Sequence, residues 1–305
     1  GRRARDHRGL GCMFKLGVIT DEISQDFQTV VKVCTDYDLE AVEIRSVDDK
    51  PPQDLQPADV DMIKAALADT DIKVCGIATP FFKCDIDSAE EREQHMDILR
   101  KCIALAHELD TSLLRCFAFW ETGKTEQRWQ EIVDAYEEPL RLAEAERITL
   151  GMENEASTSL STAALTRRFI DELGSGNVRA IWDPANELYA DAGITPFPDA
   201  YDQIKDVTVH GHMKDGDRNE AGEMVSVPVG EGLIDWAGQF ARYVEEGYED
   251  YLILETHWRP ASALSEDLLN RPGGAAFSEA GEEASRYCLD NIQRMLLPLR
   301  GESDG

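Results

Sequence analysis

Four short runs in the second half of the chain decide the fold: ITLGMENE at 148–155, VRAIWDPAN at 178–186, DVTVHGHMKD at 206–215 and YLILETHW at 251–258. Each begins with apolar, β-branched residues, as strands do, and ends in polar ones. Similar runs precede them: FKLGVIT at 14–20, AVEIRS at 41–46, KVCGIATP at 73–80 and SLLRCFAF at 112–119. Eight strands separated by helical segments favour a single (β/α)8 TIM barrel, an eight-stranded parallel α/β fold.

Amphipathic helical patterns fill the intervals between these runs. They cover 25–38, 57–69, 88–108, 125–146, 161–173, 234–246 and 279–298. Between the sixth and seventh runs, Pro196 and Pro198 leave only a short helix near 199–205. The long loop 259–278 follows the eighth strand, so we expect it to cover the active face as a lid. No GxGxxG motif follows the first strand, which counts against a dinucleotide fold and a nucleotide cofactor.

The chain divides into one domain and two short ends. Residues 1–12 form a basic, glycine-rich extension that we expect to be disordered, 13–300 form the barrel, and 301–305 form a tail. The seven cysteines are odd in number and have no CxxC spacing, which predicts buried thiols in a reducing compartment. No run of 18 apolar residues and no signal-peptide core occurs, so we predict a cytoplasmic protein without a membrane partner.

The charge is strongly acidic. The 305 residues include 60 acidic and 31 basic ones, and the net charge of −29 is spread over the length of the chain. Such a surface keeps a protein soluble in high salt, which favours a halophilic source over an acidic mesophilic protein. It also repels phosphates, which counts against a nucleic-acid partner.

Polar residues end the last four strands. Glu153, Asp183, His212 and Glu255 lie at these ends, which converge on one face of a parallel barrel. A single carboxylate there is equally well explained as a helix N-cap, but four in succession predict a metal site. Three carboxylates and one imidazole form an oxygen-rich set, which favours one divalent cation, Mn²⁺ foremost and Mg²⁺ or Co²⁺ as alternatives.

The motifs GMENE, IWDPAN, VHGHMKD and LILETHW resemble the metal-binding strand ends of the xylose isomerase-like TIM barrel superfamily. The segments GVITDEISQD, AVEIRS, IATPFFKCD and VGEGLIDW resemble its sugar phosphate isomerase/epimerase branch, and the resemblance covers roughly 13–298. It implies a metal-dependent isomerase or epimerase that acts through a metal-stabilised enediolate. Glu153 and Glu255 would be the catalytic acid/base pair, while Asp183 and His212 mainly hold the ion. The second ring nitrogen of His212 then needs a partner that fixes its tautomer.

Five further residues are candidates for binding substrate. They are Lys214, Asn186, Glu155, Arg115 and His257. Lys214 alternates onto the same face as His212, although a surface lysine is the alternative, and Arg115 is either a substrate clamp or a buried arginine paired with Glu43 or Glu153. His210 shares the face of His212 but lies deeper, so it ranks second as a ligand.

Other activities of the same fold remain open. A dehydratase acting on an inosose-type keto-cyclitol would use the same enolate and expel a β-hydroxyl. Endonuclease IV needs extra histidines after the second, third and seventh strands, and this sequence lacks them. A non-catalytic sugar-binding barrel is disfavoured because both Glu153 and Glu255 are present. The expected partner is therefore a small sugar or keto-cyclitol, with a homo-oligomer as a possible assembly.

Overall fold

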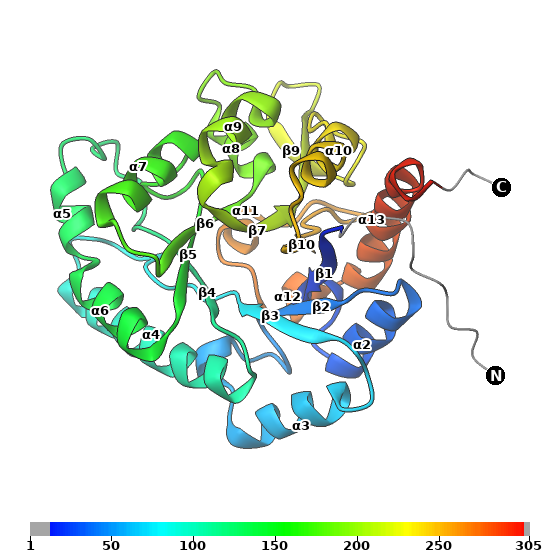
Figure 1. The fold of residues 1–305 in the computed structure, drawn as a ribbon, viewed down its shortest axis with the longest axis horizontal. Helices are drawn as coiled ribbons and strands as arrows, with labels where there is room; N and C mark the ends of the chain where they lie inside the picture. The colour runs from blue at the N-terminus through cyan, green and yellow to red at the C-terminus, as the bar shows by residue number, and fades with distance from the viewer. Residues whose placement is uncertain (1–12, 302–305) are drawn as a thin grey trace.

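A computed structural model describes residues 13–301, and these form a closed barrel of eight parallel strands surrounded by helices (Figure 1). The barrel strands are β1 (Lys15–Ile19), β2 (Ala41–Ile44), β3 (Lys73–Ile77), β4 (Leu113–Cys116), β5 (Thr149–Glu153), β6 (Val178–Trp182), β7 (Thr208–Met213) and β10 (Tyr251–Leu254). Closure comes from β1, which pairs with β2 on one side and with β10 on the other. The predicted single (β/α)8 barrel is therefore confirmed. The predicted extension 1–12 and residues 302–305 of the predicted tail lie outside the described residues.

Helices cover the outside of the barrel. They are α2 (Phe27–Asp36), α3 (Pro57–Leu67), α4 (Ala89–Glu108), α5 (Trp129–Asp134), α6 (Glu137–Glu146), α7 (Ala163–Leu173), α8 (Pro184–Ala190), α9 (Tyr201–Ile204), α10 (Trp236–Glu246) and α13 (Gly281–Leu296). Most begin and end within two residues of the predicted helical segments.

The structure corrects the sequence prediction in three intervals. The helix predicted over 125–146 is divided into α5 and α6, because Pro139 lacks an N–H and fits only the first turn of a new helix. The interval after β6 contains α8 as well as the predicted short helix, since Asp183 caps α8 and Pro184 starts it. The segment after β7 forms a hairpin of β8 (Asp215–Arg218) and β9 (Met224–Val227), which the charged sequence DGDR did not indicate.

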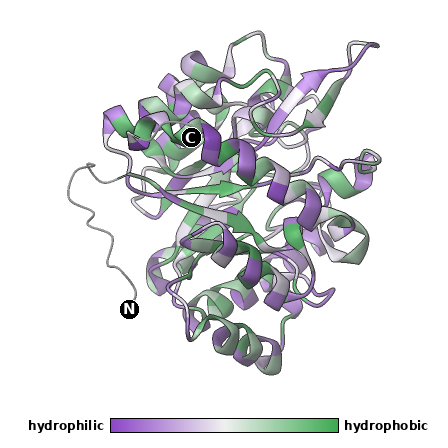
Figure 2. Cartoon of the chain, turned by 90° about the vertical axis from the view of Figure 1, so that its right-hand side faces the viewer, coloured by the Kyte–Doolittle hydropathy of each residue, from purple (hydrophilic) through white to green (hydrophobic). Residues whose placement is uncertain are grey.

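Two apolar regions support the barrel. The larger one fills the layer between strands and helices, whereas Ile19, Ala41, Cys75 and Ile253 form a small separate cluster. Along each barrel strand, residues that point into the barrel alternate with residues that point outward. In Figure 2 the hydrophobic colour gathers on the central strands, and the hydrophilic colour dominates the outer helix surfaces. The six described cysteines are buried and free, as expected. None of the described helices is long and apolar enough to cross a membrane.

The segment 259–278 crosses the carboxyl ends of the first three strands. It carries two short helices, α11 (Glu266–Asn270) and α12 (Gly274–Ser278). The amide of Gly274 donates to Ser46 Oγ over 2.9 Å, just beyond β2, and Lys83 Nζ donates to the Asn270 carbonyl over 3.0 Å, just beyond β3. The segment therefore lies over the face on which the polar strand ends converge.

Candidate metal and substrate site

The carboxyl ends of four strands bring the predicted ligand residues together. Glu153 ends β5, Asp183 follows β6, His212 lies in β7 and Glu255 follows β10. All four are buried, and one ligand atom from each lies within 4.8 Å of the others. Nδ1 of His212 lies 2.9 Å from Glu153 Oε1 and 2.9 Å from Glu255 Oε2. We call these four residues the ligand ring.

Three oxygens of the ligand ring that accept no hydrogen bond test whether the ring fits a cation. Glu153 Oε2, Asp183 Oδ2 and Glu255 Oε2 are buried and accept no hydrogen bond within the described residues. Leaving a buried carboxylate oxygen without a donor is unfavourable, unless a metal coordinates it. Each of these oxygens has a cationic neighbour: Lys214 Nζ lies 2.9 Å from Asp183 Oδ2, His212 Nδ1 2.9 Å from Glu255 Oε2, and Arg115 Nη1 3.6 Å from Glu153 Oε2. These ion pairs do not supply the missing hydrogen bonds. The donor set therefore fits a hard divalent cation.

Glu43 provides the partner that His212 needs. Glu43 Oε2 lies 2.9 Å from Nε2 of His212 and 2.8 Å from Nε2 of His210. The contact with Nε2 leaves Nδ1 of His212 directed at the ligand ring. His210 lies deeper in the barrel and bonds Glu43 instead of joining the ring. The sequence indicated Glu43 only as a possible partner of Arg115, because only the closed barrel brings the end of β2 within reach of β7.

The charged groups of the ligand ring shift the pKa values of one another. Burial would raise the pKa of Glu255, but Lys214 and other cationic neighbours hold it well below its ordinary value. Burial would also raise the pKa of Glu153, which His212 lowers. For Asp183 burial prevails over Lys214 and raises the pKa to about 6. Burial would lower the pKa of His212, yet the surrounding carboxylates raise it well above 6.5. The ring therefore holds an imidazolium among carboxylates, and a bound cation would replace its proton.

A second acidic and histidine group adjoins the ring. Glu22 and His257 approach Glu255, with His257 Nδ1 2.7 Å from Glu22 Oε1 and His257 Nε2 3.3 Å from Glu255 Oε1. Guanidinium groups already neutralise Glu22, because Arg45 and Arg259 lie 3.0 and 3.4 Å from its oxygens. Burial would raise the pKa of Glu22, but His257 and the two arginines lower it to about 2. The positive charge around Glu22 disfavours a second cation there.

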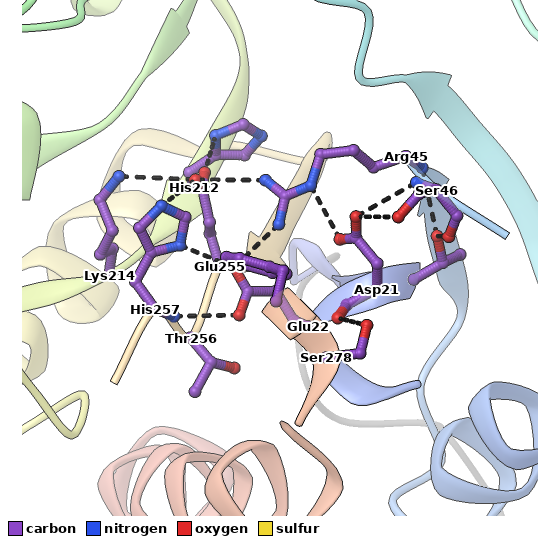
Figure 3. A network of polar contacts seen from close by, with 12 residues as sticks. Asp21, Glu22, Arg45, Ser46, His212, Lys214, Glu255, Thr256, His257 and Ser278 are labelled. Carbon is purple, nitrogen blue, oxygen red and sulfur yellow. Dashed lines mark hydrogen bonds and ion pairs between the residues drawn. The ribbon is translucent and has the colours of Figure 1, made fainter. Parts of the chain in front are cut away.

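Arg45 is the main site residue that the sequence did not single out. It is buried and contacts Asp21 over 2.8 Å, Glu22 over 3.0 Å and Glu255 over 3.5 Å. Figure 3 shows Arg45 reaching from the end of β2 toward Glu255, which also faces His212 and His257. The polar ends of the first two strands were the signal for this network, yet the partners are far apart in sequence.

A cavity of about 730 Å³ opens beside the ligand ring. Four of the predicted substrate residues line it: Glu155, Asn186, Lys214 and His257. The amide Nδ2 of Asn186 donates to the Asn154 carbonyl over 2.8 Å and lies 3.3 Å from Glu153 Oε1, so it links the cavity to the ring. Lys214 is buried, in contrast to a surface lysine.

Arg115 is placed differently from the other predicted substrate residues. Its Nη1 lies 3.6 Å from Glu153 Oε2, and its Nε donates to the Thr79 carbonyl over 3.3 Å. It does not belong to the lining of the cavity. Of the two interpretations of the sequence, the structure shows the pairing with Glu153.

The family model of the xylose isomerase-like TIM barrel matches residues 31–279. The chain belongs to this family. A xylose isomerase domain protein from Planctomyces limnophilus has 14% identity and a TM-score of 0.72, covering 95% of this chain and 99% of that one. D-allulose 3-epimerase from Methylomonas sp. in complex with D-allulose has 15% identity and a TM-score of 0.68, covering 94% and 99%.

A probable 3-DHS dehydratase from Bacillus anthracis shares the same barrel. Its identity is 16% and its TM-score 0.67, covering 87% of this chain and 98% of that one. At these identities the solved structures show a common fold. A comparison with curated proteins found no significant match. The xylose isomerase-like barrel is thus shared with enzymes of differing reported activities.

Proposed function

We propose that this protein is an isomerase or epimerase of a sugar or sugar phosphate that depends on a divalent cation. The observation that carries the proposal is the pair of buried carboxylates of Glu153 and Glu255. They come from strands separated by β6 and β7 in the barrel, and both lie 2.9 Å from the same nitrogen of His212. Two such carboxylates beside a substrate cavity suit proton transfer to and from one carbon.

The ligand ring would hold the cation through Glu153, Asp183, His212 and Glu255. Mn²⁺ is the favoured ion, and Mg²⁺ or Co²⁺ are alternatives. When bound, such a cation supplies Lewis-acid stabilisation of negative charge on a substrate oxygen. Glu43 keeps Nδ1 of His212 directed at the ring, which supports this role for the imidazole.

The environments of the two carboxylates differ, and this difference supports separate roles for them in the proposed reaction. Glu255 Oε1 lies within 3.6 Å of three basic side chains, His257, Arg45 and Lys214. These neighbours keep Glu255 ionised, so it accepts the proton from the carbon next to the substrate carbonyl. Glu153 has fewer basic neighbours, and in this proposal it takes up a proton from water in the cavity and gives that proton to the resulting enediolate. After release of product, proton exchange with water restores both groups.

A solvent-exchange assay tests the proposal. Protein loaded with Mn²⁺ in high salt is incubated in D₂O with a panel of ketoses and keto-cyclitols, and C–H exchange and products are followed by NMR. We expect exchange and an isomerised or epimerised product. Glu153→Gln and Glu255→Gln should each lower turnover by about 10²–10⁴-fold, while the exposed control Glu93→Gln should not. Failure to bind any divalent ion, or unchanged turnover in both variants, would refute the proposal.

A dehydratase is the second candidate, and His257 favours it. It belongs to the lining of the cavity, its Nε2 lies 3.3 Å from Glu255 Oε1, and Glu22 holds its Nδ1. His257 could thus protonate a departing β-hydroxyl, which leaves as water while a C=C bond forms from the enolate. The same NMR assay separates the two reactions, because dehydration yields an unsaturated product.

A further inference from the structure

The cationic side chains in the lining of the cavity are already paired with acidic groups of the protein. Among the described residues, the lining contains Lys214, Arg259 and the basic imidazole of His257, which lies between Glu22 and Glu255. Lys214 Nζ lies 2.9 Å from Asp183 Oδ2 and 3.6 Å from Glu255 Oε1. Arg259 is buried, contacts Glu22, and donates to the carbonyls of Trp258, Phe277 and Glu279 over 2.7–3.0 Å. None of these three side chains is left to neutralise an anionic substrate.

Acidic groups make the cavity still less suited to an anion. Glu155 and Glu266 belong to the lining, and the carboxylates of the ligand ring adjoin it. A phosphate group would bring about two negative charges next to Glu155 and Glu266, whose carboxylates a cation in the ligand ring does not neutralise. Neutral hydroxyls suit the site better, because Tyr189 and Ser226 offer hydroxyl partners and Glu155 accepts hydrogen bonds.

The outer part of the cavity is apolar and larger than a free sugar requires. Its wall includes Met224 and Val225 of β9, Trp258, and Leu264 and Leu269 of the segment 259–278. The volume of about 730 Å³ lies within the range of roughly 300–1,000 Å³ that encloses drug-sized ligands. A wall of this composition stabilises a ligand by burying apolar surface, which a free sugar with its many hydroxyls provides poorly.

We propose that the substrate is an uncharged keto sugar derivative that carries an apolar substituent, and not a sugar phosphate. This inference rests on the proposed function and narrows its substrate class. The sugar lies toward the ligand ring, between Glu155, Asn186 and Lys214. The substituent lies against the wall formed by β9 and the segment 259–278.

Two pairs of binding probes test the inference by calorimetry on the Mn²⁺-loaded protein. The first pair tests whether the apolar wall binds an aromatic substituent. We expect phenyl β-D-glucopyranoside to bind about 10- to 50-fold more tightly than methyl β-D-glucopyranoside. The second pair tests whether the site accepts a negative charge. We expect D-fructose 6-phosphate to bind more weakly than D-fructose. Leu264→Lys should reduce the phenyl preference and strengthen binding of the phosphate. The control Leu233→Lys, at a side chain that is 52% exposed and outside the lining, should change neither.

The outcomes separate this inference from the proposed function. Equal or weaker binding of the phenyl glycoside, no measurable binding of it, or tighter binding of the phosphate than of fructose would overturn the inference. Thermal unfolding of the Leu264→Lys protein shows whether the variant is folded. The proposed function is refuted by a different result: no member of the ketose and keto-cyclitol panel exchanges its C–H proton. That result does not depend on how tightly the four probes bind.

Discussion

Glu43 holds His212 from beneath the ligand ring: its Oε2 lies 2.9 Å from Nε2 of the imidazole, whose Nδ1 faces Glu153 and Glu255. The same oxygen contacts His210. One carboxylate on β2 therefore orients the only imidazole of the ring from β7, across the barrel interior. This relationship makes Glu43 a positioning residue for the candidate metal site.

Replacing Glu43 by Gln should weaken metal binding without unfolding the barrel. The amide lacks the negative charge that stabilises the imidazole, so we expect the affinity for Mn²⁺ to fall by about 10- to 100-fold. Calorimetric titration measures the change. Glu40→Gln, an exposed neighbour in sequence, is the matched control. Unchanged affinity in Glu43→Gln would show that the contact does not support the site.

Metal binding should weaken as the pH falls. The carboxylates around His212 raise its pKa well above 6.5, so the metal-free imidazole carries a proton at neutral pH. A cation must displace that proton, and we expect about a tenfold loss of Mn²⁺ affinity for each pH unit below neutrality. Titrations in two buffers of different ionisation enthalpy should detect about one proton released for each cation. An affinity independent of pH would contradict this assignment.

Glu187 should destabilise the protein at high pH. It is buried after β6, accepts from the Ala163 amide over 2.6 Å, and burial raises its pKa from 4.5 to about 7. Because the pKa of Glu187 is higher in the folded protein than in the unfolded one, its protonated form favours folding. Its contribution to the free energy of unfolding is therefore complete below about pH 4.5 and is lost as the pH rises through 7. Glu187→Gln should increase the free energy of unfolding by about 1–3 kcal/mol at pH 8 and have little effect at pH 4. Urea unfolding at both pH values checks this, and equal effects at both would contradict it.

Lys83 should hold the segment 259–278 over the site. Its buried ammonium donates to the Asn270 carbonyl over 3.0 Å and lies 3.6 Å from Glu155 Oε2. Lys83→Met keeps the length and apolar stem of the side chain but removes both contacts. We expect faster amide hydrogen exchange in 262–272 and a higher KM, with the barrel strands unaffected. Lys64→Met, which removes an exposed ion pair with Glu108, should leave that segment unchanged.

Salt should stabilise the fold. The net charge of −29 makes self-repulsion large. Raising KCl from about 0.1 to 1 M shortens the Debye length from about 10 to 3 Å and screens that repulsion. We therefore expect the Tm to rise with KCl, as in a halophilic protein. A Tm that stays constant or falls over this range would argue against salt adaptation.

Local sequence pattern was sufficient for the barrel and for the members of the ligand ring. Each strand is a short apolar run, each helix an amphipathic one, and eight repeats have few alternative ways to bury their apolar faces. In a parallel barrel the carboxyl ends of all strands converge, so polar residues at those ends must lie near one another. Glu153, Asp183, His212 and Glu255 could be identified on this ground.

Contacts across the barrel could be known only from the tertiary structure. Glu43 meets His212, and Glu22 meets His257, although 169 and 235 positions separate the partners. Sequence gives the order of the strands but not which inward side chains reach each other, because that depends on the barrel's diameter and register. The ion pairs of Lys214 and Arg259 and the apolar wall of the cavity depend on the same geometry. Sequence therefore identified the ligand ring and four of the residues that line the cavity, and the closed barrel decided how they pair and brought Arg45 into the site.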